Sequence, residues 1–182
     1  MQQPKQSWQK LSKKTVYDNL WIHVEEHDVI NPSGNKSIYG VVQFKNYAIG
    51  ILPIDADGNI YLVGQHRYPF NDYSWEIPEG GGDKNIDPLI SAKRELLEET
   101  GIIAAEWKLI SEIHTSNSVT DEVGYIYLAK QLSFHEPDPD EDEDITIKKI
   151  PFHEAYSMLE KGEIKDSLTV VALLKAKIIL QL

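Results

Sequence analysis

The first half of the chain alternates short apolar runs with turn residues, a pattern typical of β-strands. Two runs rich in β-branched residues, within 15–45, flank Asn31–Gly34 and predict a hairpin. A second pair of strands, at 48–54 and 60–63, flanks an Asp-Gly turn. The first dozen residues are mostly polar and predict a loose arm ahead of the strands.

One helix is marked more clearly than any other element. A strand at Trp75–Pro78 runs into Gly80–Gly82, where we expect regular structure to stop. Asp87 is then a good N-cap, and the proline at position 88 suits the first helical position because its missing N–H would be unpaired there anyway. Apolar residues repeat at helical spacing as far as Gly101, which supplies the C-terminal stop.

The second half mixes both kinds of element and shows no internal repeat. Strands are predicted at 107–113, 123–129 and 145–150, a helix at 152–161, and a last helix with Ser167 as its N-cap. Strands first, one central helix and helices at the end indicate an α+β fold or a mixed sandwich.

The composition narrows the classes of partner. There are 29 acidic residues against 18 Lys plus Arg among 182, a net charge of −11, whereas nucleic-acid binding requires a basic surface. The absence of cysteine removes disulfides and Cys-based zinc sites. The apolar runs fall far short of the ~20 residues that span a bilayer, and the N-terminus shows no secretory signal. We therefore expect a cytoplasmic protein without nucleic-acid or membrane partners.

Much of the acidity lies in two places. Seven of the nine residues in 136–144 are acidic, and without them the charge would be ordinary. The other cluster, on the predicted helix, places Glu98 and Glu99 three and four positions after Glu95, so that the carboxylates share one face. Like charges at this spacing cost roughly 0.2–0.5 kcal/mol per pair, and Mg²⁺ is a natural counter-ion for such a cluster. A solvated acidic face is the alternative.

The helix belongs to a longer pattern that resembles the Nudix box. That box reads Gly, five residues, Glu, seven residues, then Arg-Glu-aliphatic-x-Glu-Glu-x-Gly-aliphatic. Gly80 matches its first position, and 94–102 match at every specified position. One position departs, because Ile86 stands where the box has glutamate; Asp83 and Asp87 are nearby but out of register. The departure keeps open a non-catalytic protein that senses a nucleotide sugar.

Further segments resemble the branch of this family that hydrolyses ADP-ribose and nucleoside-diphosphate sugars. They are Gln65–Pro69, Trp75–Gly80 and Gly162–Ser167. The resemblance implies an α+β chain with the Nudix fold, an α/β/α sandwich of mixed sheets, as a catalytic domain over 47–182. It also implies an N-terminal β-rich extension, 1–46, that takes part in dimerisation and substrate binding, so a homodimer is expected.

The same resemblance implies roles for the matching residues. Arg94 would orient the box glutamates, Arg67 would contact the diphosphate, and Glu76 would join the metal or substrate shell. A surface arginine and a solvent-facing strand residue are the alternatives for the last two. The implied ligands of Mg²⁺ or Mn²⁺ are Glu95, Glu98, Glu99 and the backbone carbonyl of Glu79.

The acidic segment resembles the loop that carries the general base in this branch. Glu141 is the first choice and Glu143 the second, since a carboxylate there would take a proton from a metal-activated water. A loop that merely aids solubility is the alternative.

Substrate preference is signalled more weakly. ADP-ribose enzymes of the family carry a proline about fifteen residues beyond the box, where this chain has Asn117. Ser116, Asn117 and Ser118 are candidates for contacts with sugar hydroxyls, and Glu122 for a place near the metals or the terminal sugar. A polar turn between two strands is the alternative. The expected reaction is hydrolysis of a nucleoside-diphosphate sugar such as GDP-mannose to a nucleoside monophosphate and a sugar 1-phosphate; an ADP-ribose-specific pyrophosphatase is the main alternative.

Overall fold

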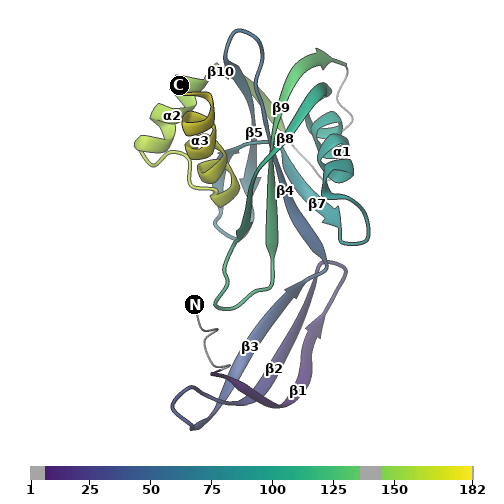
Figure 1. The fold of residues 1–182 in the computed structure, drawn as a ribbon, viewed down its shortest axis with the longest axis vertical. Coiled ribbons are helices and arrows are strands. Elements are labelled where there is room, and N and C mark those ends of the chain that lie inside the picture. Colours follow the sequence, from purple (N-terminus) through teal and green to yellow (C-terminus); the bar gives the residue numbers. More distant parts are fainter. Residues whose placement is uncertain (1–6, 136–144, 182) are drawn as a thin grey trace. The chain divides into compact units, whose positions relative to one another are not determined.

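A computed structural model describes residues 7–135 and 145–181. The chain divides into two compact units (Figure 1). The first contains the chain up to Asn46 together with His114–Glu122, and the second contains Tyr47–Ile113 and Val123–Leu182. Within the described ranges, no helix is long and apolar enough to cross a membrane.

The first unit is built on one antiparallel sheet of three strands, β1 (Gln9–Asp18), β2 (Ile22–Ile30) and β3 (Lys36–Phe44). The predicted hairpin at Asn31–Gly34 joins β2 to β3, and the side chain of Asn31 accepts hydrogen bonds from the backbone N–H groups of Ser33 and Asn35, each at 3.0 Å. The prediction of a loose arm was wrong from Gln9 onward, where β1 begins. All ten positions of β1 are exposed, so the strand carries no in–out alternation of apolar residues by which to recognise it.

The segment His114–Glu122 is attached to this sheet through β3. The N–H of Val42 donates to the carbonyl of Val119 at 2.9 Å, and the N–H of Phe44 donates to a carboxylate oxygen of Asp121 at 2.8 Å. A stretch between two later strands of the chain therefore belongs structurally to the N-terminal unit.

The second unit contains two sheets. One has the order β7-β4-β9-β8 and the other the order β10-β5-β6. Strands β4 and β9 run parallel, with Ile51 opposite Tyr127, while β5 pairs antiparallel with both β6 and β10. The bounds are β4 (Asn46–Pro53), β5 (Asn59–Arg67), β6 (Asp72–Glu76), β7 (Glu79–Asp83), β8 (Ile102–His114), β9 (Val123–Phe134) and β10 (Thr146–Pro151).

Three helices belong to the second unit: α1 (Pro88–Thr100), α2 (Phe152–Glu160) and α3 (Ser167–Leu180). The caps of α1 are confirmed. The Asp87 carboxylate accepts from the N–H of Leu89 at 2.9 Å, and Gly101 ends the helix in the left-handed conformation at φ 67°. The expected N-cap of α3 was wrong by one residue, because Asp166 caps it by accepting from the N–H of Thr169 at 2.7 Å.

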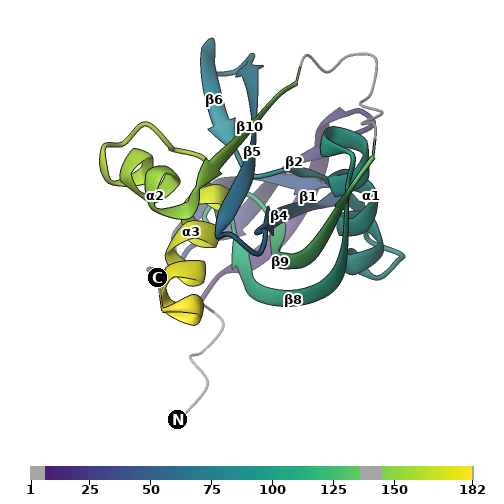
Figure 2. The ribbon, with the colours of Figure 1, turned by 90° about the horizontal axis from the view of Figure 1, so that it is seen from above.

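Helices cover both sides of the sheets in this unit, with α1 on one side and α2 and α3 on the other (Figure 2). Alternate residues of β4 enter two separate cores. Ile49 and Ile51 pack with Leu96 on the α1 side, while Leu52 packs with Leu173 on the α3 side. This is the predicted α/β/α sandwich of mixed sheets.

The glycine run does not end regular structure, as the sequence had suggested, because β7 passes through it. The glycines serve close packing instead. A Cβ on Gly82 would lie 2.7 Å from Cγ1 of Ile49, and one on Gly80 would lie 2.3 Å from the carboxyl carbon of Glu95. Both distances are far below contact range, so β7 reaches α1 and β4 only because these side chains are missing.

Candidate active site

Helix α1 presents the acidic residues of the box from one element. Glu95 and Glu99 are buried, whereas the side chain of Glu98 is about one-third exposed. The 3.6-residue period places 95, 98 and 99 on adjoining positions of the helix surface. The capped N-terminus at Asp87 fixes where this surface begins.

Strand β7 closes onto that surface. The backbone N–H of Glu79 donates to Oε2 of Glu99 at 3.0 Å, and Nη2 of Arg94 donates to the carbonyl of Gly81 at 3.0 Å. With the tight approach of Gly80 to Glu95, these contacts join the two ends of the box into one structure. The spacing between Gly80 and Arg94 is therefore the length of chain needed to turn from β7 into α1.

Arg94 holds two of the glutamates. Its guanidinium donates to Oε1 of Glu95 and to Oε2 of Glu98. Burial alone would lower the pKa of Arg94, but the carboxylates of Glu95 and Glu98 outweigh it and raise the pKa. The sequence-based role of Arg94, orienting the box carboxylates, agrees with this geometry.

The departure from the box at position 86 lies on an exposed turn. The Ile86 side chain points into solvent with 42% of its surface exposed. Asp83 closes the turn, since its Oδ1 accepts from both the backbone N–H and the side-chain amide of Asn85 at 2.8 Å. Asp87 caps α1, so each nearby aspartate already has a local structural function.

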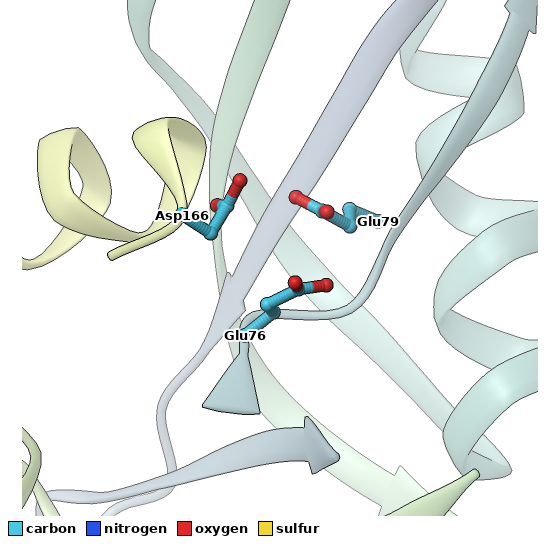
Figure 3. A group of neighbouring side chains, drawn as sticks. All are labelled: Glu76, Glu79 and Asp166. Atoms are coloured by element: carbon cyan, nitrogen blue, oxygen red, sulfur yellow. The ribbon is translucent and has the colours of Figure 1, made fainter. Parts of the chain in front are cut away.

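Glu79 also belongs to a second acidic cluster (Figure 3). Among the described residues, one group of three carboxylates places an oxygen of each within 4.8 Å of the others: Glu76, Glu79 and Asp166. Arg67, at the end of β5, donates through Nε to both oxygens of Glu76 at 3.1 Å and through Nη2 to Oε1 of Glu79 at 2.7 Å. The three box glutamates do not meet that distance criterion, since the guanidinium of Arg94 bridges Glu95 and Glu98.

The pKa values of Glu76 and Glu79 are shifted in opposite directions. Burial, and then the neighbouring carboxylates of Asp166 and Glu76, raise the pKa of Glu79 well above its usual value. Burial acts in the same sense on Glu76, but hydrogen bonds and charge from Arg67 overcome it and lower its pKa. The Oε2 atom of Glu79 is buried with no hydrogen-bond partner among the described residues.

The donor atoms here fit a hard divalent cation. Carboxylates and a backbone carbonyl offer only oxygen, the ligand type that Mg²⁺ and Mn²⁺ prefer. The position of Glu79 suits its expected role, because its backbone is tied to Glu99 and its carbonyl belongs to the strand that closes on α1.

Four predicted substrate-contact residues, Ser116, Asn117, Ser118 and Glu122, lie in the first unit. There the carbonyl of Ser116 accepts from the N–H of Val119 at 3.1 Å, and Glu122 accepts from the Thr115 hydroxyl at 2.5 Å. These contacts describe a polar turn, and a role of the four residues in substrate binding stays a prediction. The predicted bases Glu141 and Glu143 lie outside the described residues.

Sequence reasoning overlooked two features of the second cluster. Asp166 received no role, and Glu79 was expected to act through its backbone alone. A signal for Asp166 was present, since Asp followed by Ser-Leu-Thr before an apolar helix is a capping sequence and places a carboxylate at a helix start. The side-chain contact of Glu79 with Arg67 is between strands and left no local signal.

Comparisons with known proteins agree with the geometry. Residues 45–173 match the NUDIX domain family, and residues 8–42 match the nucleoside diphosphate sugar hydrolase N-terminal domain. An ADP-ribose pyrophosphatase of Bacillus subtilis is 31% identical, with the match covering 90% of this chain and 89% of that protein. A methanol dehydrogenase activator of Bacillus methanolicus is 30% identical, covering 89% and 88%.

The fold is shared with a solved structure described as an ADP compounds hydrolase, with a TM-score of 0.87 over 99% of this chain and 97% of the other, at 22% identity. The family match extends over most of the sequence and includes the whole of the assembled box from Gly80 to Ile102. This chain therefore belongs to the Nudix family, as a Nudix hydrolase.

Proposed function

We propose that the protein hydrolyses the diphosphate bond of nucleoside-diphosphate sugars and releases a nucleoside monophosphate and a sugar 1-phosphate. The observation that carries the proposal is the closure of β7 on α1. It brings the backbone of Glu79, the fork of Arg94 and the carboxylates of Glu95, Glu98 and Glu99 into one oxygen-rich site. The N-terminal match to a nucleoside diphosphate sugar hydrolase domain supports this substrate class.

The residues divide the work as follows. Glu95, Glu98, Glu99 and the Glu79 carbonyl would hold Mg²⁺, or Mn²⁺, and Arg94 keeps two of these carboxylates in place. When bound, such ions polarise the diphosphate and lower the pKa of water. A carboxylate of the acidic segment accepts the proton of the water that attacks phosphorus, and the bridging P–O bond breaks. Glu141 is the preferred candidate for this base, and Glu143 is the second candidate.

Several further residues are proposed to contact the substrate. Arg67 meets the diphosphate, and Glu76 and Glu79 fix the direction of its guanidinium, having taken up Nε and Nη2. Ser116, Asn117, Ser118 and Glu122 of the first unit are proposed contacts to the rest of the substrate.

A homodimer in the cytoplasm completes the proposal. The three-stranded sheet is thin, and the connection between β1 and β2 exposes two large apolar side chains, Trp21 at 66% and Leu20 at 80%. A two- or three-stranded sheet of this kind needs a further layer for stability, and a second copy of the chain supplies one. We expect the Trp21→Glu variant to sediment as a monomer where the wild type sediments as a dimer. A wild-type monomer at micromolar concentration contradicts this arrangement.

A strict ADP-ribose pyrophosphatase is the second candidate, because the Bacillus subtilis relative bears that name. Release of monophosphates from a panel containing ADP-ribose, GDP-mannose and UDP-glucose separates the two. Turnover of ADP-ribose alone favours the narrow enzyme, and turnover of several favours the broad one.

The metal site is tested on the same panel. We expect Glu98→Gln and Glu99→Gln to lower turnover at least 100-fold with the fold intact by circular dichroism, because each removes an oxygen ligand at the proposed ion. Glu112→Gln, an exposed glutamate of β8, is the matched control and keeps wild-type turnover. Unchanged turnover of both α1 variants at saturating Mg²⁺ would reject the metal assignment.

A further inference from the structure

A cleft of about 380 Å³ opens beside the second acidic cluster. One wall is the β5–β6 turn with β6, and it contributes Phe70, Asp72 and Tyr73. The opposite wall is the connection between α2 and α3, which contributes Glu163 and Lys165. Nζ of Lys165 lies 3.9 Å from Oδ2 of Asp72, so the two walls approach each other at this ion pair.

The inner end of the cleft adjoins the box. Glu79 lines the cleft with its side chain, while its backbone N–H binds Glu99 of α1 at 3.0 Å. A diphosphate held at the box would therefore have the group on one of its ends within reach of the cleft.

Beyond Arg67, which meets the diphosphate in the proposed function, the charge of the lining disfavours a further phosphate as the occupant. Five carboxylates (Asp72, Glu76, Glu79, Glu163 and Asp166) stand against two cationic side chains, Arg67 and Lys165. Arg67 is already paired with Glu76 and Glu79. Carboxylates accept hydrogen bonds and repel anions, so the lining suits a neutral group with many hydroxyl donors.

One buried carboxyl oxygen of the lining has no hydrogen-bond partner among the described residues. This atom is Oε2 of Glu79, and its carboxylate points toward Asp166 and Glu76 (Figure 3). Leaving a buried polar atom unpaired costs about 1–3 kcal/mol, a cost that a hydrogen bond to a bound molecule removes.

Two aromatic rings give the cleft an apolar side. Phe70 is 83% exposed and Tyr73 is 47% exposed, and both line the cleft. Tyr73 is held edge-on against Trp75, with ring centroids 5.5 Å apart. Concave sites that combine aromatic faces with a few placed polar groups are typical of small-ligand pockets, and a pyranose or furanose ring offers both an apolar C–H face and hydroxyls.

We propose that this cleft binds the sugar ring of the nucleoside-diphosphate sugar. Phe70 and Tyr73 pack against the face of the ring, and the carboxylates of Asp72 and Glu163 accept hydrogen bonds from its hydroxyls. The proposal rests on the proposed function and assigns sugar recognition to the second unit, away from Ser116–Ser118.

The test compares substrates that differ only in the sugar. GDP-mannose and ADP-ribose are each assayed beside the methyl ester of the same nucleoside diphosphate, which keeps the base and the diphosphate but has no sugar ring beyond it. We expect Phe70→Ala and Glu163→Gln to lower kcat/KM for the cleaved nucleotide sugar about tenfold, mainly through KM, and to change the methyl ester less than twofold.

Matched controls lie next to each variant. Tyr68→Ala removes a ring from the same turn, 92% exposed and outside the cleft, and Glu160→Gln removes an exposed carboxylate at the end of α2. Both variants are expected to keep kcat/KM for every substrate within twofold of the wild-type value. Equal losses on sugar and methyl substrates, or no loss on either, overturn the proposal.

A binding measurement separates this proposal from the proposed function. If the wild type cleaves no nucleotide sugar, the proposed function fails, and equilibrium dialysis of GDP-mannose and ADP-ribose decides about the cleft. If Phe70→Ala weakens the binding of the nucleotide sugar about tenfold and leaves the binding of the methyl esters unchanged, the cleft binds the sugar ring as proposed. Binding that the variant leaves unchanged, or no binding by the wild type, overturns it.

Discussion

The two carboxylate clusters of the second unit are built on the same plan and differ in depth. In each, one arginine divides its donors between two glutamates: Arg94 serves the box on α1, and Arg67 serves Glu76 and Glu79. The Arg94 side chain and Glu98 are partly exposed and only Glu95 is buried, whereas Glu76 and Oε2 of Glu79 are both buried. An exposed pair contributes little to stability, but a buried one becomes costly when a single partner is removed. The comparison predicts that Arg67 contributes more to folding stability than Arg94 does.

The largest effect is expected from Arg67→Met. Removal of a partner from a buried pair costs about 3–5 kcal/mol, and the partial exposure of Arg67 reduces this to about 2–3 kcal/mol of unfolding free energy. Urea denaturation measures it. Because Glu76 and Glu79 are left uncompensated, the double variant with Glu79→Gln recovers part of the loss. A variant as stable as wild type would show that the deeper cluster is not held by its arginine.

The next largest effect is expected from Arg94→Ala, which should lower turnover more than it lowers stability. Loss of a residue that orients proposed metal ligands lowers turnover about 10–100-fold. Stability falls less than in Arg67→Met, by about 1–2 kcal/mol, because Glu98 is partly exposed and only Glu95 is buried. Turnover and urea midpoints are measured on the same preparation. A variant that unfolds more easily than Arg67→Met would reverse the comparison.

The smallest effect is a change in pH dependence caused by Glu79. Its pKa is raised in the folded protein, so the folded state holds its proton more tightly than the unfolded chain does. The stabilising contribution of Glu79 is fully present below the pKa that this group has in the unfolded chain. It is lost as the pH rises through the pKa that the group has in the folded protein. Glu79→Gln, which cannot ionise, should gain stability relative to wild type between pH 5 and pH 8. The difference in urea midpoint between the two proteins reports this, and a difference that stays constant with pH contradicts it.

The sequence predicted those elements whose ends are set by interactions between residues close together in the chain. Asp87, Pro88 and Gly101 define α1 through hydrogen bonds within a few residues, and the box spacing is the length of a turn from β7 into that helix. The α/β/α layering followed from the family resemblance and from the order of the elements.

Features that depend on distant parts of the chain were missed or misplaced. Gly80 and Gly82 look like a strand end, yet they allow β7 to pack on Glu95 and Ile49, from α1 and β4. Strand β1 has no apolar alternation because the unit leaves it exposed. The Arg67–Glu79 pair spans two strands, and no rule of local spacing indicates it.

Asp166 has two structural roles, and together they limit which substitutions this part of the cleft tolerates. Its carboxylate caps α3 through the N–H of Thr169, and the same side chain lines the cleft. Replacing a capping aspartate by alanine costs about 0.5–2 kcal/mol of stability, and only Asn, Ser or Thr preserve the cap. Phe70, Asp72 and Glu163 lie on exposed turns and edges and do not cap a helix. Variation among related proteins is therefore expected at the rim of the cleft, while the inner position of Asp166 is restricted to residues that cap the helix beginning there.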